Sequence, residues 1–336
     1  MKLLVDAIYI NNSGGLVLLQ YLISELLVRN VNVHFLLDER VRSLNIIHDD
    51  ITTYLKGSES LRDAYYKEYG NNYDNVLCFG NIPPTRKLKG KVFTFFQNVL
   101  LAVTDNSTPC IQRIKLLFKR MYIRLMKNNT DYWIVQTTNT FTIIEKAFYI
   151  QKDKICVLPF FNESLYVNKS IEINNRTDYA YIAKCIPQKN HKMLIDAWIE
   201  LAKKGIYPKL HLTLDVIPKS LEKLLVRAND YGCKIVNHGL CDSHRIAKIY
   251  QQSKVALYVS TNESFGLGMI EAMSMGCDII GPNLDYVTSI CSPSEMFSYD
   301  ASSLVNAICK YENGNSKKTF VKIKNNIQEF INFITK

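Results

Sequence analysis

Two glutamates flank a glycine-rich stretch in the C-terminal half of this 336-residue chain. Glu263 and Glu271 are eight positions apart within STNESFGLGMIEAMSMG, and Gly266 and Gly268 lie between them. The apolar run before this stretch indicates a buried strand, and the residues from Gly266 onward indicate a helix. The first N–H groups of a helix are unpaired and its dipole end is positive, so a glycine-lined helix start favours a phosphate group.

Carboxylates beside a phosphate require an explanation, because like charges repel. Glu263 and Glu271 are explained if they accept hydrogen bonds from hydroxyl groups on either side of the phosphates, such as those of a sugar and of a ribose. The alternatives are a surface acid at Glu263 and a solvated helix residue at Glu271. The same letters approximate the dinucleotide pattern G-x-G-x-x-G, but Glu271 stands where the third glycine belongs, which disfavours that interpretation.

Alternating strand and helix patterns place this stretch in an α/β fold. Apolar runs recur along both halves and are separated by segments of helical periodicity, as at residues 16–29. Such alternation predicts parallel sheets with crossover helices, in which ligands bind at the carboxyl ends of the strands. The expected strands are residues 2–10, 31–37, 92–96, 132–136, 179–183, 209–214, 234–237, 255–259 and 277–280.

The chain length predicts two domains, because a single hydrophobic core rarely grows beyond roughly 250–300 residues. We assign residues 1–165 to an N-terminal domain and residues 178–315 to a C-terminal domain, each a doubly wound parallel sheet. The polar stretch at 166–177 is the expected linker. Residues 316–336 have helical periodicity and are expected to form a C-terminal helix that could cross back to the N-terminal domain.

The segment that begins at Glu263 resembles the E-x7-E signature of retaining glycosyltransferases, in particular glycosyltransferase family 4 (group 1). The resemblance extends over most of the C-terminal half and more loosely over the N-terminal half. It implies the GT-B fold, with two Rossmann-like domains and a cleft between them. It also implies that Glu263 contacts the transferred sugar and that Glu271 holds the ribose. The residues whose backbone would bind the donor sugar and phosphates are Phe265, Gly266, Leu267 and Gly268.

Two lysines extend this resemblance. The sequence YIAKCIPQKN at residues 181–190 is similar to a family segment in which a Gly-Arg pair is followed five residues later by lysine. Lys184 and Lys189 would then neutralise the donor pyrophosphate. Ala-Lys replaces Gly-Arg here, which keeps the charge and loses the planar bidentate fork of arginine. The alternative is that both are ordinary surface lysines.

Two loops resemble other parts of the family's site. The loop around His238 and Gly239 would meet the nucleotide base. The segment NNSGG resembles the N-terminal glycine loop that faces the diphosphate, so Gly14 and Gly15 join the expected phosphate-binding residues.

Many family members place a histidine near the reacting carbon, and the equivalent stretch FTFFQNVL offers Gln97 and Asn98 instead, which can form hydrogen bonds. The resemblance implies retention of the anomeric configuration, with the departing phosphate accepting the proton of the acceptor hydroxyl. Negative charge builds on the leaving nucleoside diphosphate in an oxocarbenium-like transition state. No D-x-D motif occurs and the histidines lack metal-ligand spacing, so we expect neither a metal nor another cofactor.

The formal net charge of +10 indicates an anionic partner. Six lysines and arginines lie within residues 111–127 without a single acid, interleaved with large apolar residues. The pattern fits a basic amphipathic helix on an anionic membrane surface, and equally an ordinary surface helix with one face on the core. We do not expect a nucleic-acid partner, because no recognisable reading motif accompanies the charge.

The composition is that of a globular protein of a reducing compartment. Nine cysteines are spread singly with no CxxC pair. No apolar run approaches the roughly 20 residues that span a bilayer, and Asp6 interrupts the apolar N-terminus, which we interpret as a buried first strand. We expect a cytoplasmic protein that could associate peripherally with the inner face of the cell membrane.

These observations favour a retaining, metal-independent glycosyltransferase of hexosyltransferase type. It would move a sugar from a UDP-sugar or GDP-sugar to a glycan acceptor, expected to be lipid-linked, in the biosynthesis of a bacterial surface polysaccharide such as O-antigen or capsule. The alternative is a GT-B-shaped protein without transferase activity that binds a nucleotide sugar or glycan as an assembly or regulatory partner. The two glutamates favour the enzyme, whereas the altered Gly-Arg pair and the missing histidine leave the alternative open.

Overall fold

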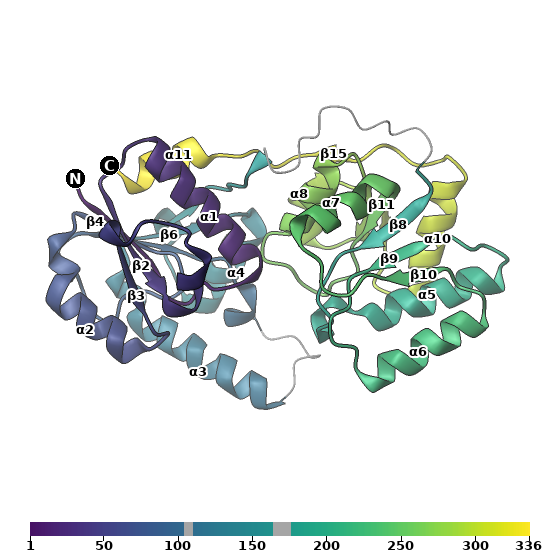
Figure 1. Ribbon diagram of the computed structural model, residues 1–336, viewed down its shortest axis with the longest axis horizontal. Helices are drawn as coiled ribbons and strands as arrows, with labels where there is room; N and C mark the ends of the chain where they lie inside the picture. The colour runs from purple at the N-terminus through teal and green to yellow at the C-terminus, as the bar shows by residue number, and fades with distance from the viewer. Residues whose placement is uncertain (104–109, 164–175) are drawn as a thin grey trace. The chain divides into compact units, whose positions relative to one another are not determined.

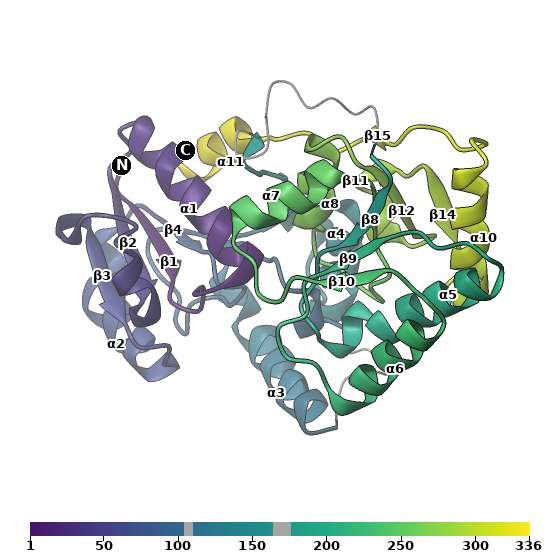
Figure 2. The ribbon, with the colours of Figure 1, turned by 45° about the vertical axis from the view of Figure 1, so that its right-hand side comes forward.

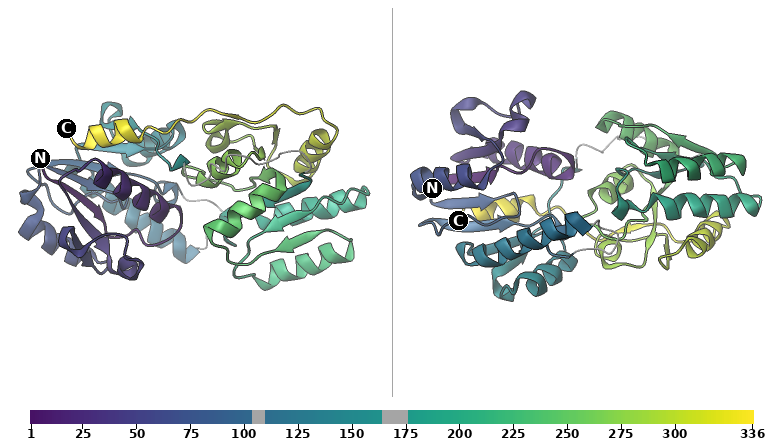
Figure 3. Two further views of the ribbon diagram at one scale, coloured as in Figure 1. Left: turned by 45° about the horizontal axis from the view of Figure 1, so that its top comes forward. Right: turned by 90° about the horizontal axis from the view of Figure 1, so that it is seen from below.

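A computed structural model describes three stretches of the chain (Figure 1), residues 1–103, 110–163 and 176–336. Contacts divide the described chain into two compact units. The N-terminal unit comprises residues 1–103, 110–162 and 324–336, and the C-terminal unit comprises the described part of Glu163–Ile323. Both chain ends lie in the N-terminal unit (Figure 3). Most of the expected linker at 166–177 lies outside the described residues.

The N-terminal unit is built on a seven-stranded parallel sheet of order β3-β2-β1-β4-β5-β6-β7. Its strands are β1 (Leu3–Ala7), β2 (Val33–Asp38), β3 (Thr52–Leu55), β4 (Asn75–Cys78), β5 (Lys91–Phe95), β6 (Tyr132–Val135) and β7 (Ile155–Val157). Its α-helices are α1 (Ser13–Val28), α2 (Glu59–Tyr69), α3 (Cys110–Met126), α4 (Thr138–Phe148) and α11 (Ile327–Ile334).

Side-chain alternation along β1 buries both of its faces. Leu3 and Val5 belong to the core cluster that contains the apolar faces of α1 and α11, whereas Leu4 packs with Tyr66 of α2 on the other face. Figure 2 shows α1 in purple and α11 in yellow beside each other. A parallel strand covered on both faces is expected to be a near-continuous apolar run, as β1 is.

The C-terminal unit contains a six-stranded parallel sheet of order β10-β9-β8-β11-β12-β14. Its strands are β8 (Asp178–Tyr181), β9 (Leu210–Leu212), β10 (Ile235–Asn237), β11 (Ser253–Leu257), β12 (Asp278–Pro282) and β14 (Glu295–Phe297), and a separate antiparallel pair joins β13 (Cys291–Ser292) to β15 (Phe320–Val321). Its α-helices are α5 (His191–Lys203), α6 (Lys219–Asp230), α7 (Ser243–Gln252), α8 (Leu267–Ser274), α9 (Asp285–Thr288) and α10 (Ala301–Glu312).

These two sheets confirm the predicted class of two parallel α/β units. In the C-terminal unit, α5, α6 and α10 contribute to one core cluster with Tyr179 and Tyr181 of β8 and with Leu210 and Leu212 of β9. Figure 2 shows α7 and α8 on the opposite side of this sheet from α5 and α6. The side chains of β8 and β9 that point away from α5 therefore face α7 and α8.

Two expected helices have different bounds in the structure. The last helix covers only Ile327–Ile334, because the preceding residues bind elsewhere: Thr319 Oγ1 accepts from the Ile279 N–H at 2.7 Å, and β15 pairs with β13. Phe330 and Ile334 then enter the core of the N-terminal unit. The first helix begins at Ser13, so Gly14 and Gly15 lie in its first turn rather than in a loop.

Candidate functional site

The loops after β8 and β11 meet at one edge of the C-terminal sheet, because these strands are parallel neighbours. The Thr261 N–H donates to the Gln188 carbonyl at 2.8 Å, and this bond ties the two loops together. The Tyr181 hydroxyl donates to the Lys189 carbonyl at 2.7 Å. The connection that carries the predicted lysines is thereby held against the segment that carries Glu263.

Lys189 and Glu263 form an ion pair at this edge, in which Nζ contacts Oε1. The Ser260 hydroxyl donates to the same carboxylate oxygen at 2.7 Å. The two side chains are 22% and 17% exposed, so the pair is largely shielded and retains access to solvent. The sequence placed both residues in the site but did not predict that they contact each other.

Two buried tyrosines, Tyr181 and Tyr286, and the more exposed Tyr299 fix the loop after β11. The hydroxyl oxygens of Tyr181 and Ser260 lie 3.1 Å apart, Tyr286 donates to the Ser260 carbonyl at 2.9 Å, and Tyr299 donates to the Val259 carbonyl at 2.7 Å. Burial raises the pKa of Tyr181 and of Tyr286 well above the ordinary value, so both hydroxyls remain donors. Nothing in the sequence distinguishes these three among 20 tyrosines, and sequence reasoning missed them.

Gly266 begins α8 in the left-handed conformation, with φ of 72°. A side chain there would be strained, and its Cβ would lie 2.9 Å from Ile290 Cδ1. No acid occupies the first turn and no side chain caps the helix, so its first N–H groups have no side-chain acceptor at the cap position. The predicted glycine-lined helix start is present in the structure.

The remaining predicted residues of this segment differ in how they could contribute. The Phe265 side chain is buried, which leaves its backbone to face a ligand, and Leu267 is half-buried in the first turn. A Cβ at Gly268 would lie 3.0 Å from the Tyr258 hydroxyl oxygen. Glu271 is half-buried on the fifth residue of α8, one turn after Leu267.

Lys184 lies on the same β8–α5 connection as Lys189, three residues after the end of β8, and its side chain is exposed. The Ile186 N–H donates to its carbonyl at 2.9 Å, which turns the chain toward α5. The structure thus places both predicted lysines at the edge that carries Glu263, and Lys189 is the one whose ion pair joins the two loops.

His238 and Gly239 follow β10 at the same end of the sheet. Gly239 has φ of 67° and open space around the position of a Cβ, so its backbone conformation explains the glycine. His238 Nε2 lies 2.9 Å from His211 Nδ1, and His211 Nε2 lies 2.9 Å from Asp178 Oδ2. Asp178 and His211 were not predicted, because they lie 60 and 27 positions from His238 and form no local motif.

The predicted residues of the N-terminal unit gather where β1, β4 and β5 end. Gln97 Oε1 lies 3.4 Å from the position that a Cβ on Gly15 would occupy. The Gln97 side chain donates to the Phe79 carbonyl at 3.0 Å. Gly14 is exposed in the first turn of α1. Asn98 caps the 3-10 turn at Val99–Leu101, accepting from the Leu100 N–H at 3.2 Å, so its side chain already has a structural role.

The predicted basic segment forms α3, whose faces differ sharply. Leu116 and Ile123 are buried in the N-terminal unit. The opposite face presents an exposed apolar stripe at helical spacing, in which Phe118 is 68% and Leu125 is 73% exposed. The exposed large apolar residues of α3 are Ile111, Ile114, Leu117, Phe118, Met121 and Leu125.

Some cations of α3, and Lys127 directly after it, stabilise the fold. Arg120 Nε donates to the Leu101 carbonyl at 3.1 Å, Arg124 Nε donates to the Ala147 carbonyl at 2.8 Å, and Lys127 Nζ donates to the Phe148 carbonyl at 3.1 Å. Lys115 and Lys119 are exposed. Across the described ranges, no helix is long and apolar enough to cross a membrane.

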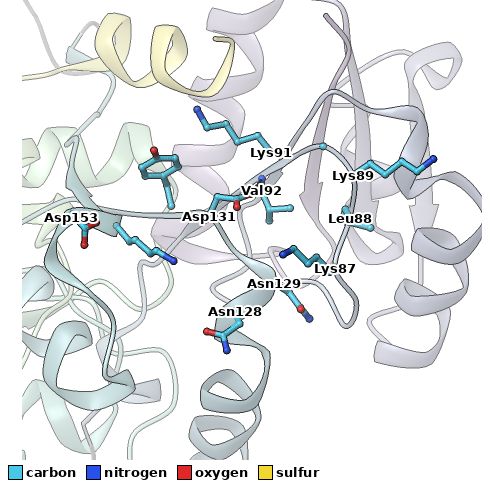
Figure 4. A pocket seen from close by; sticks show the side chains of 12 residues that line it. Lys87, Leu88, Lys89, Lys91, Val92, Asn128, Asn129, Asp131 and Asp153 are labelled. Carbon is cyan, nitrogen blue, oxygen red and sulfur yellow. Dashed lines mark hydrogen bonds between the residues drawn. The ribbon is translucent and has the colours of Figure 1, made fainter.

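A pocket of about 510 Å³ lies at the amino ends of β5 and β6 (Figure 4). Lysines and two aspartates line it, but none of the predicted site residues does. Open parallel sheets bind ligands at the carboxyl ends of their strands, so we do not assign the predicted chemistry to this pocket. Within the described residues, no group of three or more histidine, cysteine or acidic side chains is placed to hold a metal ion.

Comparison with known proteins finds a family model that matches the C-terminal half, two groups of curated relatives and solved structures of similar fold. The family model for glycosyl transferases group 1 matches residues 166–330. The chain is 24% identical over 204 residues to a GDP-Man:Man(3)GlcNAc(2)-PP-Dol alpha-1,2-mannosyltransferase of Xenopus tropicalis, covering 54% of this chain and 41% of that relative. It is 31% identical over 110 residues to the serotype-specific mannosyltransferase WbdA of Escherichia coli, covering 31% of this chain and 13% of that relative.

The fold matches a solved structure over its whole length. HepE of Anabaena, in complex with UDP and glucose, superposes with a TM-score of 0.69 at 15% identity, covering 100% of this chain and 95% of that chain. This likeness confirms the expected GT-B fold. The chain spans less than half the length of each of the two curated relatives.

Proposed function

We propose that the chain transfers a sugar from a nucleoside-diphosphate sugar to a glycan acceptor with retention of configuration, because residues 166–330 match the family model for glycosyl transferases group 1. The observation that carries the proposal is the ion pair between Lys189 and Glu263. Glu263 lies three residues before Gly266, the glycine that precedes the first turn of α8. Cation, carboxylate and free helix N–H groups are the chemistry that a sugar diphosphate requires.

Each group has a role in this proposal. Lys184, Lys189 and the first N–H groups of α8 stabilise the charge that builds on the leaving diphosphate. Glu263 accepts hydrogen bonds from the transferred sugar, and Glu271 accepts them from the ribose. The bond between the anomeric carbon and the phosphate oxygen breaks while a bond to the acceptor oxygen forms.

The acceptor hydroxyl proton passes to the departing phosphate oxygen, so the proposed reaction uses no metal and no other cofactor. The N-terminal unit would supply Gly14, Gly15 and Gln97 to the donor or acceptor. Gln97 keeps Oε1 directed at the first turn of α1, whereas Asn98 is occupied as a cap, which makes Gln97 the better candidate for the position of the family histidine.

The names of the relatives support a proposal for the donor and acceptor classes. One relative is named as a GDP-mannose enzyme acting on a dolichol diphosphate glycan, another as a serotype-specific mannosyltransferase, and HepE is described with UDP. We propose a UDP-sugar or GDP-sugar donor and a lipid-linked glycan acceptor, in bacterial surface polysaccharide biosynthesis such as that of O-antigen or capsule.

Turnover of the full chain tests this function directly. Purified protein is incubated with a panel of UDP-hexoses and GDP-hexoses and with lipid-linked acceptors, and release of the nucleoside diphosphate is measured. Acceptor-dependent release that disappears in Glu263→Gln and persists in Glu312→Gln, a carboxylate paired with Lys254 in the same unit, supports the enzyme. Nucleotide binding without any turnover would instead support the non-catalytic alternative.

We also propose that α3 docks the protein on the inner face of the cell membrane. Its exposed apolar stripe is flanked by lysines and arginines, which is the arrangement that binds anionic lipid surfaces. Phe118→Ser with Leu125→Ser should abolish sedimentation with phosphatidylglycerol vesicles. The matched change Leu27→Ser with Val28→Ser, at exposed positions of α1, should leave it intact. If the α3 variant and the α1 variant sedimented with the vesicles to the same extent, α3 would not be the membrane-binding surface.

A further inference from the structure

Three polar side chains form a line across neighbouring strands of the C-terminal sheet. Asp178 begins β8, His211 lies in the middle of β9, and His238 follows β10. The line runs through His211, which is only 2% exposed. His211 points away from the α5 core, because its neighbours Leu210 and Leu212 point into that core. The rings of His211 and His238 stack with centroids 5.1 Å apart.

The carboxylate of Asp178 determines where the protons of this line reside. Burial raises the pKa of Asp178, but the hydrogen bond with His211, then Thr177 Oγ1 at 2.9 Å and Lys209 Nζ at 3.2 Å, outweigh burial and hold this pKa below its usual value. An ionised carboxylate can only accept, so His211 Nε2 carries a proton and donates it to Asp178.

The proton positions on the other ring nitrogens, His211 Nδ1 and both nitrogens of His238, can then be assigned in turn. Lys209 already balances the charge of Asp178, and a second buried cation beside it would be unfavourable, so we assign His211 a single ring proton on Nε2, which makes its Nδ1 an acceptor. His238 Nε2 must donate to it. Burial first, and then the nearby cations Arg245 and Lys209, lower the pKa of His238, which favours its neutral ring. Its Nδ1 is left with a lone pair, is not buried, and has no partner among the described residues.

We infer that Asp178 and His211 position His238 so that its Nδ1 accepts a hydrogen bond from a ring N–H of the nucleotide base. This inference rests on the proposed function. Uracil and guanine carry such an N–H on the ring edge, whereas cytosine and adenine present a lone pair there that would oppose the lone pair of His238. His238 is thus a specificity-determining residue, and Asp178 and His211 are positioning residues that fix its tautomer.

The tautomer can be measured without any ligand. Long-range proton–nitrogen NMR spectra of the full chain labelled with ¹⁵N-histidine report which ring nitrogen is protonated, and His238→Gln identifies the His238 signals. The expected result is a neutral His238 with its proton on Nε2. A proton on Nδ1 at neutral pH would overturn the inference.

Base selectivity is then measured as the affinities of UDP, GDP, CDP and ADP by calorimetry. We expect UDP or GDP to bind about tenfold tighter than both CDP and ADP. Asp178→Asn should reduce this ratio to below about threefold, and so should His211→Phe, which keeps a stacked ring and removes the acceptor. Asp196→Asn, which changes an exposed pair on α5, should preserve the ratio.

Two failures of this experiment have different meanings. If no nucleoside diphosphate binds, both the proposed nucleotide site and the proposed role of His238 are wrong. If nucleotides bind but wild type, Asp178→Asn and His211→Phe show the same ratio of affinities, the proposed function stands and the proposed role of His238 in base selection is wrong.

Discussion

The ammonium of Lys189 and the carboxylate of Glu263 contact each other across two loops that are 74 residues apart in sequence. Groups in direct contact affect activity as a unit, so their substitutions should not be additive. We expect Glu263→Gln and Lys189→Gln each to lower turnover roughly 100-fold. The turnover of the double variant should lie within about threefold of that of the less active single variant.

A nearby pair supplies the control for this cycle. Lys192 and Asp196 pair at 2.7 Å on the exposed surface of α5, one turn apart. Their single and double substitutions to Gln and Asn should leave turnover within about twofold of wild type. Additive losses at Lys189 and Glu263 would show that the two residues act independently.

Glu271 should govern nucleotide affinity rather than the chemical step. The residue lies one turn into α8, where it would accept from ribose hydroxyls, and such a contact is made equally in the ground state and the transition state. Glu271→Ala should weaken UDP or GDP binding about tenfold and leave turnover at saturating donor within about threefold. Reduced saturated turnover with unchanged binding would contradict this division of roles.

Among the glycines of the site, Gly266 should tolerate substitution least. Its left-handed conformation and the close Ile290 methyl group predict that Gly266→Ala costs roughly 1–3 kcal/mol of unfolding free energy in urea. Gly314 has the same φ of 72° with nothing near the position of a Cβ, so Gly314→Ala measures the backbone term alone. Only Gly266→Ala should also weaken nucleotide binding. Equal costs in both variants would exclude a contribution from packing.

His191 predicts a pH dependence of stability. Burial, with a contribution from the charge of Lys189, lowers its pKa to about 4, and its Nε2 is buried without a partner among the described residues. The ordinary histidine pKa is about 6.5, so between pH 6.5 and 4 the unfolded chain binds a proton that the folded chain does not. Stability from this group is therefore complete above pH 6.5 and falls as the pH drops, by up to about 3 kcal/mol.

The measurement compares urea unfolding of wild type and His191→Gln at pH 7.5 and pH 4.5. The variant should lose less stability between the two pH values than wild type does. His244→Gln, at an exposed position of α7, should follow wild type. Parallel losses in wild type and His191→Gln would show that His191 does not titrate as proposed.

Local sequence signals predicted the helix start at Gly266 because glycine spacing, an apolar strand and a helical period act within a few residues of one another. The same signals could not predict that Lys189 pairs with Glu263, since that contact depends on which strands are neighbours. The line from Asp178 to His238 was missed for the same reason. The final helix was predicted too long because hydrogen bonds of Thr319, a tertiary interaction, override its periodicity.

The position of α11 has a consequence for how the chain folds during synthesis. Phe330 and Ile334 complete the core around Phe95, yet they follow the whole C-terminal unit in sequence. The N-terminal unit therefore emerges from the ribosome first but cannot complete its core until residues 327–334 have also emerged. Until then the C-terminal unit, whose elements are contiguous, can fold to completion before its predecessor.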